Sequence, residues 1–130
     1  MNDNRISIIE LLAGKIIASG ATYAVPKLIE VYAYDPNGNF SMQLELDVAG
    51  TTGTATIFYK VTNNTDGLDA DRFIKPVDSD IFTAFAKTDG EDADGRDLVD
   101  FNVETCHQVQ ICVTANGGDI KIDKLIAAVQ

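Results

Sequence analysis

The stretch FSMQLELDV, residues 40–48, decides the fold because apolar and polar side chains alternate along its whole length. The apolar side chains occupy every second position, at Phe40, Met42, Leu44, Leu46 and Val48. A period of two residues places them on one face of an extended chain and the polar side chains on the other. The stretch therefore predicts a β-strand with one buried face and one face in water.

The segments on either side of this stretch predict neighbouring strands. KLIEVYAY, residues 27–34, precedes it, and the intervening DPNGN, residues 35–39, contains the asparagine and glycine that tolerate the positive φ of a hairpin turn. On the other side, TATIFYKVT, residues 54–62, follows the glycine-bounded AGTTG, residues 49–53, and alternates in the same way. We therefore expect a three-stranded antiparallel meander.

The C-terminal part of the chain shows the same alternation. DLVDFNVE, residues 97–104, and HQVQICVT, residues 107–114, both read as strands. ANGGD, residues 115–119, has the composition of a tight turn and leads into IKIDKLIAAV, residues 120–129. These patterns predict that the chain ends in a hairpin.

Three other segments are less regular. NNTDGLDADRF, residues 63–73, predicts a long polar loop, and DIFTAF, residues 80–85, fits either a strand or one helical turn capped by Ser79. In residues 1–20 the spacing of the apolar side chains fits a helix, whereas the abundance of isoleucine fits a strand. The side chains with helical spacing are Ile9, Leu12 and Ile16. We expect an N-terminal arm followed by a strand.

These elements together predict an all-β fold. Seven to nine short strands separated by turns favour two packed antiparallel sheets, a jelly-roll-like β-sandwich. A chain of 130 residues is too short for two ordinary domains. We therefore expect one domain at residues 21–130, with residues 1–20 as an N-terminal arm or first strand.

The net charge of −10 lies mostly in the middle of the chain. Residues 66–104 hold 12 acidic and 4 basic side chains, whereas residues 1–65 hold 6 and 4 and residues 105–130 hold 2 of each. A surface for phosphate backbones needs the opposite sign, so the charge disfavours nucleic-acid binding. The acidic segment is expected to face water, a basic partner or cations.

The chain shows no signal for membrane insertion. Its most apolar stretch, residues 6–20, is interrupted by Glu10 and Lys15, and no run approaches the ~20 apolar residues that a spanning helix needs. No basic leader precedes this stretch. We expect a protein that is made in a cytoplasm and stays there until it is assembled into something larger.

The segment TDGEDADGRD, residues 88–97, is the densest acidic cluster in the sequence. An EF-hand loop needs oxygen ligands at its positions 1 and 12, but with Gly95 at position 6 these positions fall on Gly90 and Phe101. A looser calcium site is an open alternative, with Asp89, Asp92 and Asp94 as its ligands. Because a glycine-flanked polar loop is normally solvated, we favour a solvated loop and assign no metal or catalytic residue to it.

Cys106, His107 and Cys112 are the remaining reactive side chains. Six residues of continuous strand would separate the two cysteines by roughly 20 Å, too far for a disulfide, so we expect two free thiols. His107 is the only histidine, and a Cys/His metal site or a nucleophile with a histidine base would need further partners. The sequence therefore predicts no catalytic residues, no cofactor and no enzyme.

Several stretches together carry a resemblance to a known group of proteins. They are GTTGTATIFYKVTNNTDG (residues 50–67), FIKP (residues 73–76) and FAKTDGEDADGRDLVDFNVETCHQVQICVTANGGDIKI (residues 85–122). In this order they resemble small virion-associated β-sandwich proteins of tailed bacteriophages and prophages. The likeness covers roughly residues 20–130 and is one of pattern more than of a single diagnostic motif.

The resemblance implies a structural part in a phage particle, either as a capsid-surface (decoration) protein or in the tail. The expected partners are other virion subunits and further copies of the same chain, and the expected location is the virion after synthesis in the bacterial host cytoplasm. Residues 1–20 are the first candidate for an assembly contact, because an arm can pair with a neighbour as an extra strand. Residues 89–97 are the second candidate.

Two other functions remain as alternatives. A carbohydrate- or ligand-binding β-sandwich module with a loop calcium site is the main one, although the chain has no tryptophan to form an aromatic platform. Its tyrosines stand at positions 23, 32, 34 and 59. A small hydrolase comes last, because only the acidic loop would support it.

Overall fold

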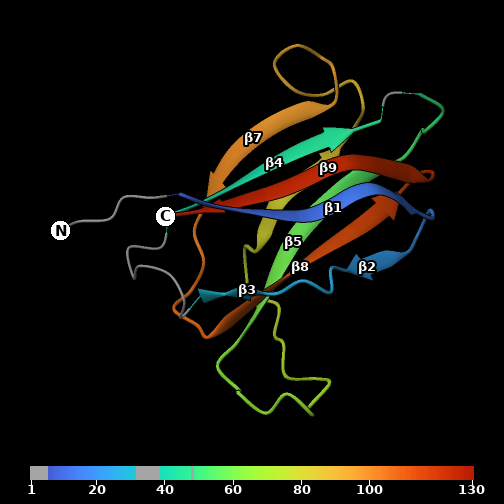
Figure 1. Ribbon diagram of the computed structural model, residues 1–130. Coiled ribbons are helices and arrows are strands. Elements are labelled where there is room, and N and C mark those ends of the chain that lie inside the picture. The colour runs from blue at the N-terminus through green and yellow to red at the C-terminus, as the bar shows by residue number, and fades with distance from the viewer. Residues whose placement is uncertain (1–5, 32–38, 48) are drawn as a thin grey trace.

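The computed structural model describes residues 6–31, 39–47 and 49–130, and every named element in these ranges is a β-strand (Figure 1). The nine strands are β1 (Ser7–Ile17), β2 (Thr22–Ala24), β3 (Ile29–Glu30), β4 (Phe40–Leu46), β5 (Thr54–Thr62), β6 (Asp80–Phe85), β7 (Arg96–Phe101), β8 (Gln108–Asn116) and β9 (Ile120–Val129). Residues 80–85 thus form a strand and not the alternative helical turn.

The strands form two antiparallel sheets that pack face to face. The four-stranded sheet has the order β1-β9-β4-β7, and the five-stranded sheet has the order β2-β8-β5-β6, with β3 also paired to β8. In Figure 1 the first sheet lies above the second. The predicted all-β antiparallel sandwich is confirmed.

The strand pairs are nested in the sequence. β5 pairs with β6, β4 with β7, β2 and β3 with β8, and β1 with β9. Residues 63–79 therefore lie at the centre of this nesting, and each strand before them pairs with a strand after them. Both halves of the chain contribute strands to each of the two sheets. This arrangement is that of a jelly roll, which agrees with the predicted jelly-roll-like sandwich.

The local hairpins expected from the turn sequences are wrong. β4 and β5 lie in different sheets, so they form no meander, and β8 and β9 also lie in different sheets, so residues 117–119 connect the sheets. Ile29 pairs with Val109 of β8 and not with β4, while residues 32–38 of the expected hairpin lie outside the described ranges. A glycine-containing turn can reverse the chain within one sheet or pass it to the facing sheet, and alternation alone does not distinguish the two.

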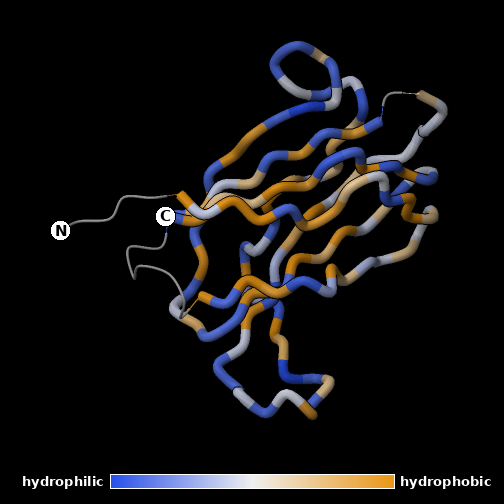
Figure 2. Tube along the Cα trace, viewed as in Figure 1, coloured by the Kyte–Doolittle hydropathy of each residue, from blue (hydrophilic) through white to orange (hydrophobic). Residues whose placement is uncertain are grey.

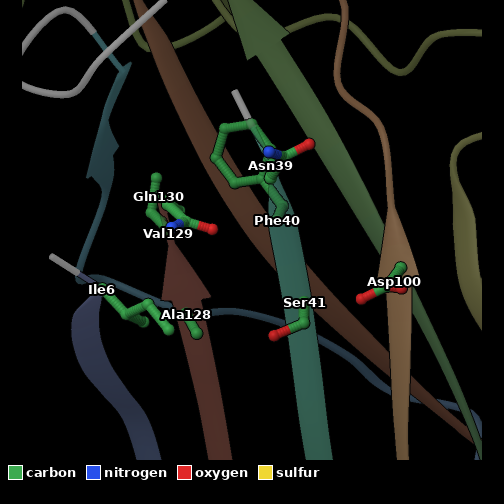
Figure 3. A pocket seen from close by; sticks show the side chains of 8 residues that line it. All are labelled: Ile6, Asn39, Phe40, Ser41, Asp100, Ala128, Val129 and Gln130. Atoms are coloured by element: carbon green, nitrogen blue, oxygen red, sulfur yellow. The ribbon is translucent and has the colours of Figure 1, made fainter. Parts of the chain in front are cut away.

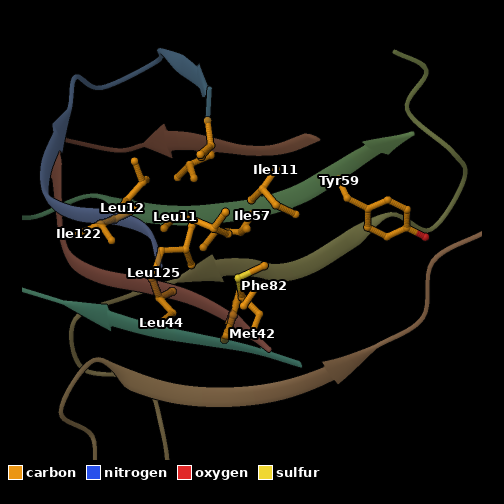
Figure 4. Packing of buried hydrophobic residues seen from close by; sticks show 14 of the residues in the cluster. Leu11, Leu12, Met42, Leu44, Ile57, Tyr59, Phe82, Ile111, Ile122 and Leu125 are labelled. Carbon is orange, nitrogen blue, oxygen red and sulfur yellow. The ribbon is translucent and has the colours of Figure 1, made fainter. Parts of the chain in front are cut away.

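The core lies between the inward faces of the two sheets (Figure 4). β4 shows the burial pattern that its alternation predicts, with Phe40, Met42, Leu44 and Leu46 buried. From the other sheet β5 and β8 supply fully buried side chains, among them Ile57 and Ile111. Burying one such side chain stabilises the fold by about 1.5–3 kcal/mol, so this layer is the main source of stability.

A β-bulge explains why the start of the chain also fits a helix. The register of β1 against β9 shifts between Glu10 and Leu12, so Leu11 and Leu12 are both buried. The extra residue changes the spacing of inward side chains from two to three, which places Ile9 and Leu12 on the same face of the strand, whereas Ile16 is exposed on the opposite face. Gly14, with φ of 64°, adds a second irregularity that only a residue without a Cβ adopts easily.

Candidate interaction surface

The outer face of the four-stranded sheet carries apolar side chains that face solvent. The strand register places four outward positions side by side in a first row, Ile8, Ala128, Ser41 and Asp100. A second row across the same strands holds Glu10, Ile126, Gln43 and Leu98. Ile8 is 66% exposed and Leu98 is 55% exposed. We call Ile6, Ile8, Leu98, Ile126 and Ala128 the apolar strip.

A shallow hollow of about 210 Å³ lies at the end of this face next to the C-terminal Gln130 (Figure 3). Ile6, Ser41, Asp100 and Ala128 are among the residues that line it. Ser41 and Ala128 have small side chains, so the middle strands are recessed between the larger side chains on β1 and those on β7. The face therefore has protruding apolar groups beside a depression.

The far end of the same face is polar, and its charged side chains form ion pairs with one another. Its three ion pairs are Arg96 Nη2 to Glu45 Oε1 at 2.9 Å, Lys121 Nζ to Asp47 Oδ2 at 3.4 Å and Lys124 Nζ to Glu10 Oε1 at 3.7 Å. The backbone N–H of Ala49 donates to Asp47 and lowers the pKa of that carboxyl, and Lys121 lowers it further. The strip thus borders a region whose charges pair with each other.

The predicted acidic candidate, residues 89–97, forms a loop that organises itself. Asp89 Oδ2 accepts the N–H of Ala86 at 2.8 Å, and the carbonyl of Asp89 accepts the N–H of Gly95 at 2.9 Å. A Cβ added at Gly90 would overlap the carbonyl oxygen of Arg96, so the glycines allow the close turn. No group of three or more His, Cys, Asp or Glu side chains that could hold a metal ion occurs in the described ranges, so Asp89, Asp92 and Asp94 do not form such a cluster.

The other predicted candidate, residues 1–20, is mostly occupied by β1. Ser7–Ile17 pairs with β9 along its length, so these residues already form hydrogen bonds within their own sheet. Residues 1–5 lie outside the described part. Because β1 is an edge strand, this segment offers a neighbour both its open edge and its outward side, where Ile8 and Ile16 are exposed.

The two cysteines are free thiols, as predicted. Burial, and then the carboxylate of Glu104, raises the pKa of the Cys106 thiol to about 11. Burial also raises the pKa of Cys112, partly opposed by Lys60. Both thiols therefore stay protonated at neutral pH and are poor nucleophiles. The backbone N–H of His107 donates to the carbonyl of Thr62 at 3.0 Å and fixes the entry to β8.

A second depression, of about 510 Å³, lies between residues 61–76 and residues 104–106. Its lining includes Asn64, Asp69, Arg72 and Glu104. Next to it, the hydroxyl of Tyr59 donates to Glu104 Oε1 at 2.7 Å. Burial, and then Glu104, raises the pKa of this hydroxyl, which makes it a structural donor at neutral pH. Sequence reasoning did not predict this groove, because its two walls come from loops far apart in the chain.

Comparisons with known proteins assign no function to these surfaces. No protein-family model, no curated protein and no solved structure matches the chain. The described residues also include no helix with the length and apolar character needed to cross a bilayer.

One sequence signal could have located the apolar strip. IAAV, residues 126–129, is a continuous apolar run, and ISII, residues 6–9, is apolar except for Ser7, so strict alternation is lost in both. Such runs are typical of strands that are covered on both faces. The two runs are antiparallel partners at the same end of the sheet, with Ile8 opposite Ala128.

Proposed function

We propose that this chain is a non-enzymatic structural protein of a tailed-phage particle, on the capsid surface or in the tail, which docks to neighbouring subunits. The observation that carries the proposal is the apolar strip on the outer face of the four-stranded sheet. Large apolar side chains that gather on one face of a soluble domain typically mark an interaction site. Here Ile6, Ile8 and Leu98 are more than half exposed on a face that also has a depression.

Two further features support a structural role. The order of strand, turn and loop resembles that of small virion-associated β-sandwich proteins. The side chains with raised pKa values, Tyr59, Cys106 and Cys112, are held protonated by burial, which suits packing and not acid–base or nucleophilic chemistry. Because one fold hosts many functions, the proposal rests on the surface and the resemblance together.

The test is to purify particles from a lysogen that encodes this chain and to count its copies by quantitative mass spectrometry. We expect a fixed, high copy number relative to the major capsid or tail proteins. The double variant Ile8→Lys/Leu98→Lys should lower that number, whereas Ile74→Lys should not, because Ile74 is similarly exposed but lies at the second depression, away from the apolar strip. Absence of the wild-type chain from purified particles would contradict the proposal.

The groove beside Glu104 favours the second function, a carbohydrate- or ligand-binding module. Amide, carboxylate and guanidinium groups from Asn64, Asp69 and Arg72 line it, and such groups suit hydroxyl-rich ligands. Glycan-array binding that is lost in Asp69→Ala and Arg72→Ala would support this alternative over a purely structural role.

A further inference from the structure

We infer that the apolar strip is covered by the same strip of a second copy of this chain, so that the protein forms a two-fold symmetric dimer through the outer faces of its four-stranded sheets. The inference specifies the partner of the docking face proposed above and rests on that docking role. It is carried by strand patterning, shape, charge and area.

The strand patterning indicates that this end of the sheet is built to be covered. Along most of β4 only one face is apolar, as expected for a sheet with one face in water. At residues 126–129 of β9 both faces are apolar, and in the neighbouring residues 6–9 Ser7 is the one polar side chain. The inward side chains there fill the core, but Ile6 and Ile8 remain more than half exposed in the described structure. A second layer on the outer face would complete their burial.

The face combines exposed side chains with a depression. Ile8 on β1 and Leu98 on β7 are exposed at opposite edges of the sheet. The hollow lined by Ser41 and Ala128 lies on the two strands between those edges (Figure 3). A two-fold interface brings the same patch of both subunits together, so a patch that contains protrusions and a depression can fit its own copy. One surface thus supplies both halves of the contact.

The charge of the face disfavours a strongly charged partner and adds no repulsion of its own against a second copy. The whole chain carries a net charge of −10, so two copies repel each other over most of their surfaces. On this face three ion pairs neutralise the charges next to the strip. Among the described residues, Asp100 is the one acid in the two rows without an ion pair. A strongly basic or acidic partner would find little charge here, whereas a second copy meets a nearly neutral surface.

The area of the face predicts a weak dimer. Four strands spaced about 4.8 Å apart, with roughly eight residues each at about 3.3 Å per residue, give roughly 500 Å² per copy. Two copies would bury about 1,000 Å² in total, the lower limit for a specific interface. Such a contact suits assembly, where many weak contacts act together.

The test is sedimentation velocity of the full chain from about 10 µM to about 1 mM, with a reductant to exclude disulfides. We expect a reversible monomer–dimer equilibrium. Ile8→Lys and Leu98→Lys should each weaken dimerisation by about tenfold or more, because each inserts a charge into the apolar contact. Ile74→Lys is the matched control, since Ile74 is 68% exposed and the substitution adds the same charge outside the strip. It should change the dimer dissociation constant less than about twofold.

Three outcomes would overturn the inference. The first is a wild-type chain that stays monomeric throughout this concentration range. The second is a dimer that Ile74→Lys weakens as much as Ile8→Lys does. The third is a dimer lost in Ile8→Lys but kept in Leu98→Lys, which would indicate pairing along the β1 edge and not across the face. A monomer that still enters phage particles would overturn this inference and leave the proposed function standing.

Discussion

The outer faces of the two sheets differ in how they treat apolar side chains. On the five-stranded sheet the outward Phe58 of β5 lies opposite Cys112 of β8, and the chain itself covers both. Lys75 lies over the Phe58 ring at 5.1 Å, and its amine is 3.7 Å from Asp80. On the four-stranded sheet no described residue covers Ile8 or Leu98 in this way, and both stay more than half exposed.

This difference shows that an apolar side chain on an outer face is either covered by the chain itself or left exposed to solvent. Phe58 is only 9% exposed, so it belongs to the stability of the monomer. Ile8 contributes little to the monomer, because its side chain is largely in water before and after folding. An apolar group that the fold leaves uncovered, beside others that it covers, is the one to consider for intermolecular contact.

The largest effect that tests this comparison is on the free energy of unfolding. Phe58→Ala should lower it by about 2–4 kcal/mol, because the substitution removes a buried ring and leaves a cavity under Lys75. Ile8→Ala should change it by less than about 0.5 kcal/mol, since exposed positions contribute little. Urea denaturation followed by circular dichroism measures both. It should be done well below the dimer dissociation constant, so that dimer dissociation does not add to the Ile8→Ala value. Equal losses would mean that the two faces do not differ as described.

The strands could be predicted from sequence much better than their partners. The alternation in residues 40–46 depends on neighbours two positions away, and the structure confirms it residue by residue. The partners of the same strand, β7 and β9, lie more than fifty residues away, and no local turn sequence encodes that choice. The bulge at Leu11 shows the limit even within one strand, because one extra residue made a strand resemble a helix.

The candidate surfaces show the same limit. The acidic loop at residues 88–97 is conspicuous because its charges are adjacent in sequence, but three of its aspartates, Asp89, Asp94 and Asp97, accept hydrogen bonds from nearby backbone N–H groups. The apolar strip takes its residues from positions 6, 8, 98, 126 and 128, which only the jelly-roll pairing brings together. Local patterns therefore found the loop and missed the strip.

A smaller effect concerns the pH dependence of the free energy of unfolding, because burial in the fold also keeps the two cysteine thiols protonated. In the unfolded chain Cys106 ionises near its ordinary pKa of 9.0, whereas in the folded chain its pKa is raised to about 11. Between these values the unfolded state loses the proton first, so rising pH favours unfolding and stability should fall from about pH 9 to about pH 11. Cys112, whose pKa burial also raises, should add to the fall.

The measurement is urea denaturation at a series of pH values in this window. Cys106→Ala/Cys112→Ala should flatten the decline, although Tyr59, whose pKa burial also raises, leaves a residual slope at the highest pH values. A variant that declines as steeply as the wild type would show that the two thiols are not protected by the fold.

The smallest effect is the response of the dimer to salt, and it separates an apolar contact from a charged one. Two copies that each carry a net charge of −10 repel each other, and raising the ionic strength from about 0.05 M to about 0.5 M screens that repulsion. The ion pairs beside the strip lie within one copy, so salt has little intermolecular attraction to weaken. The dimer should therefore tighten by a few-fold as salt increases, as sedimentation would measure. Asp100→Asn removes an unpaired acid beside the hollow and should reduce this response. If salt instead loosens the dimer, opposite charges must hold it together, and the contact would have to be sought away from the apolar strip.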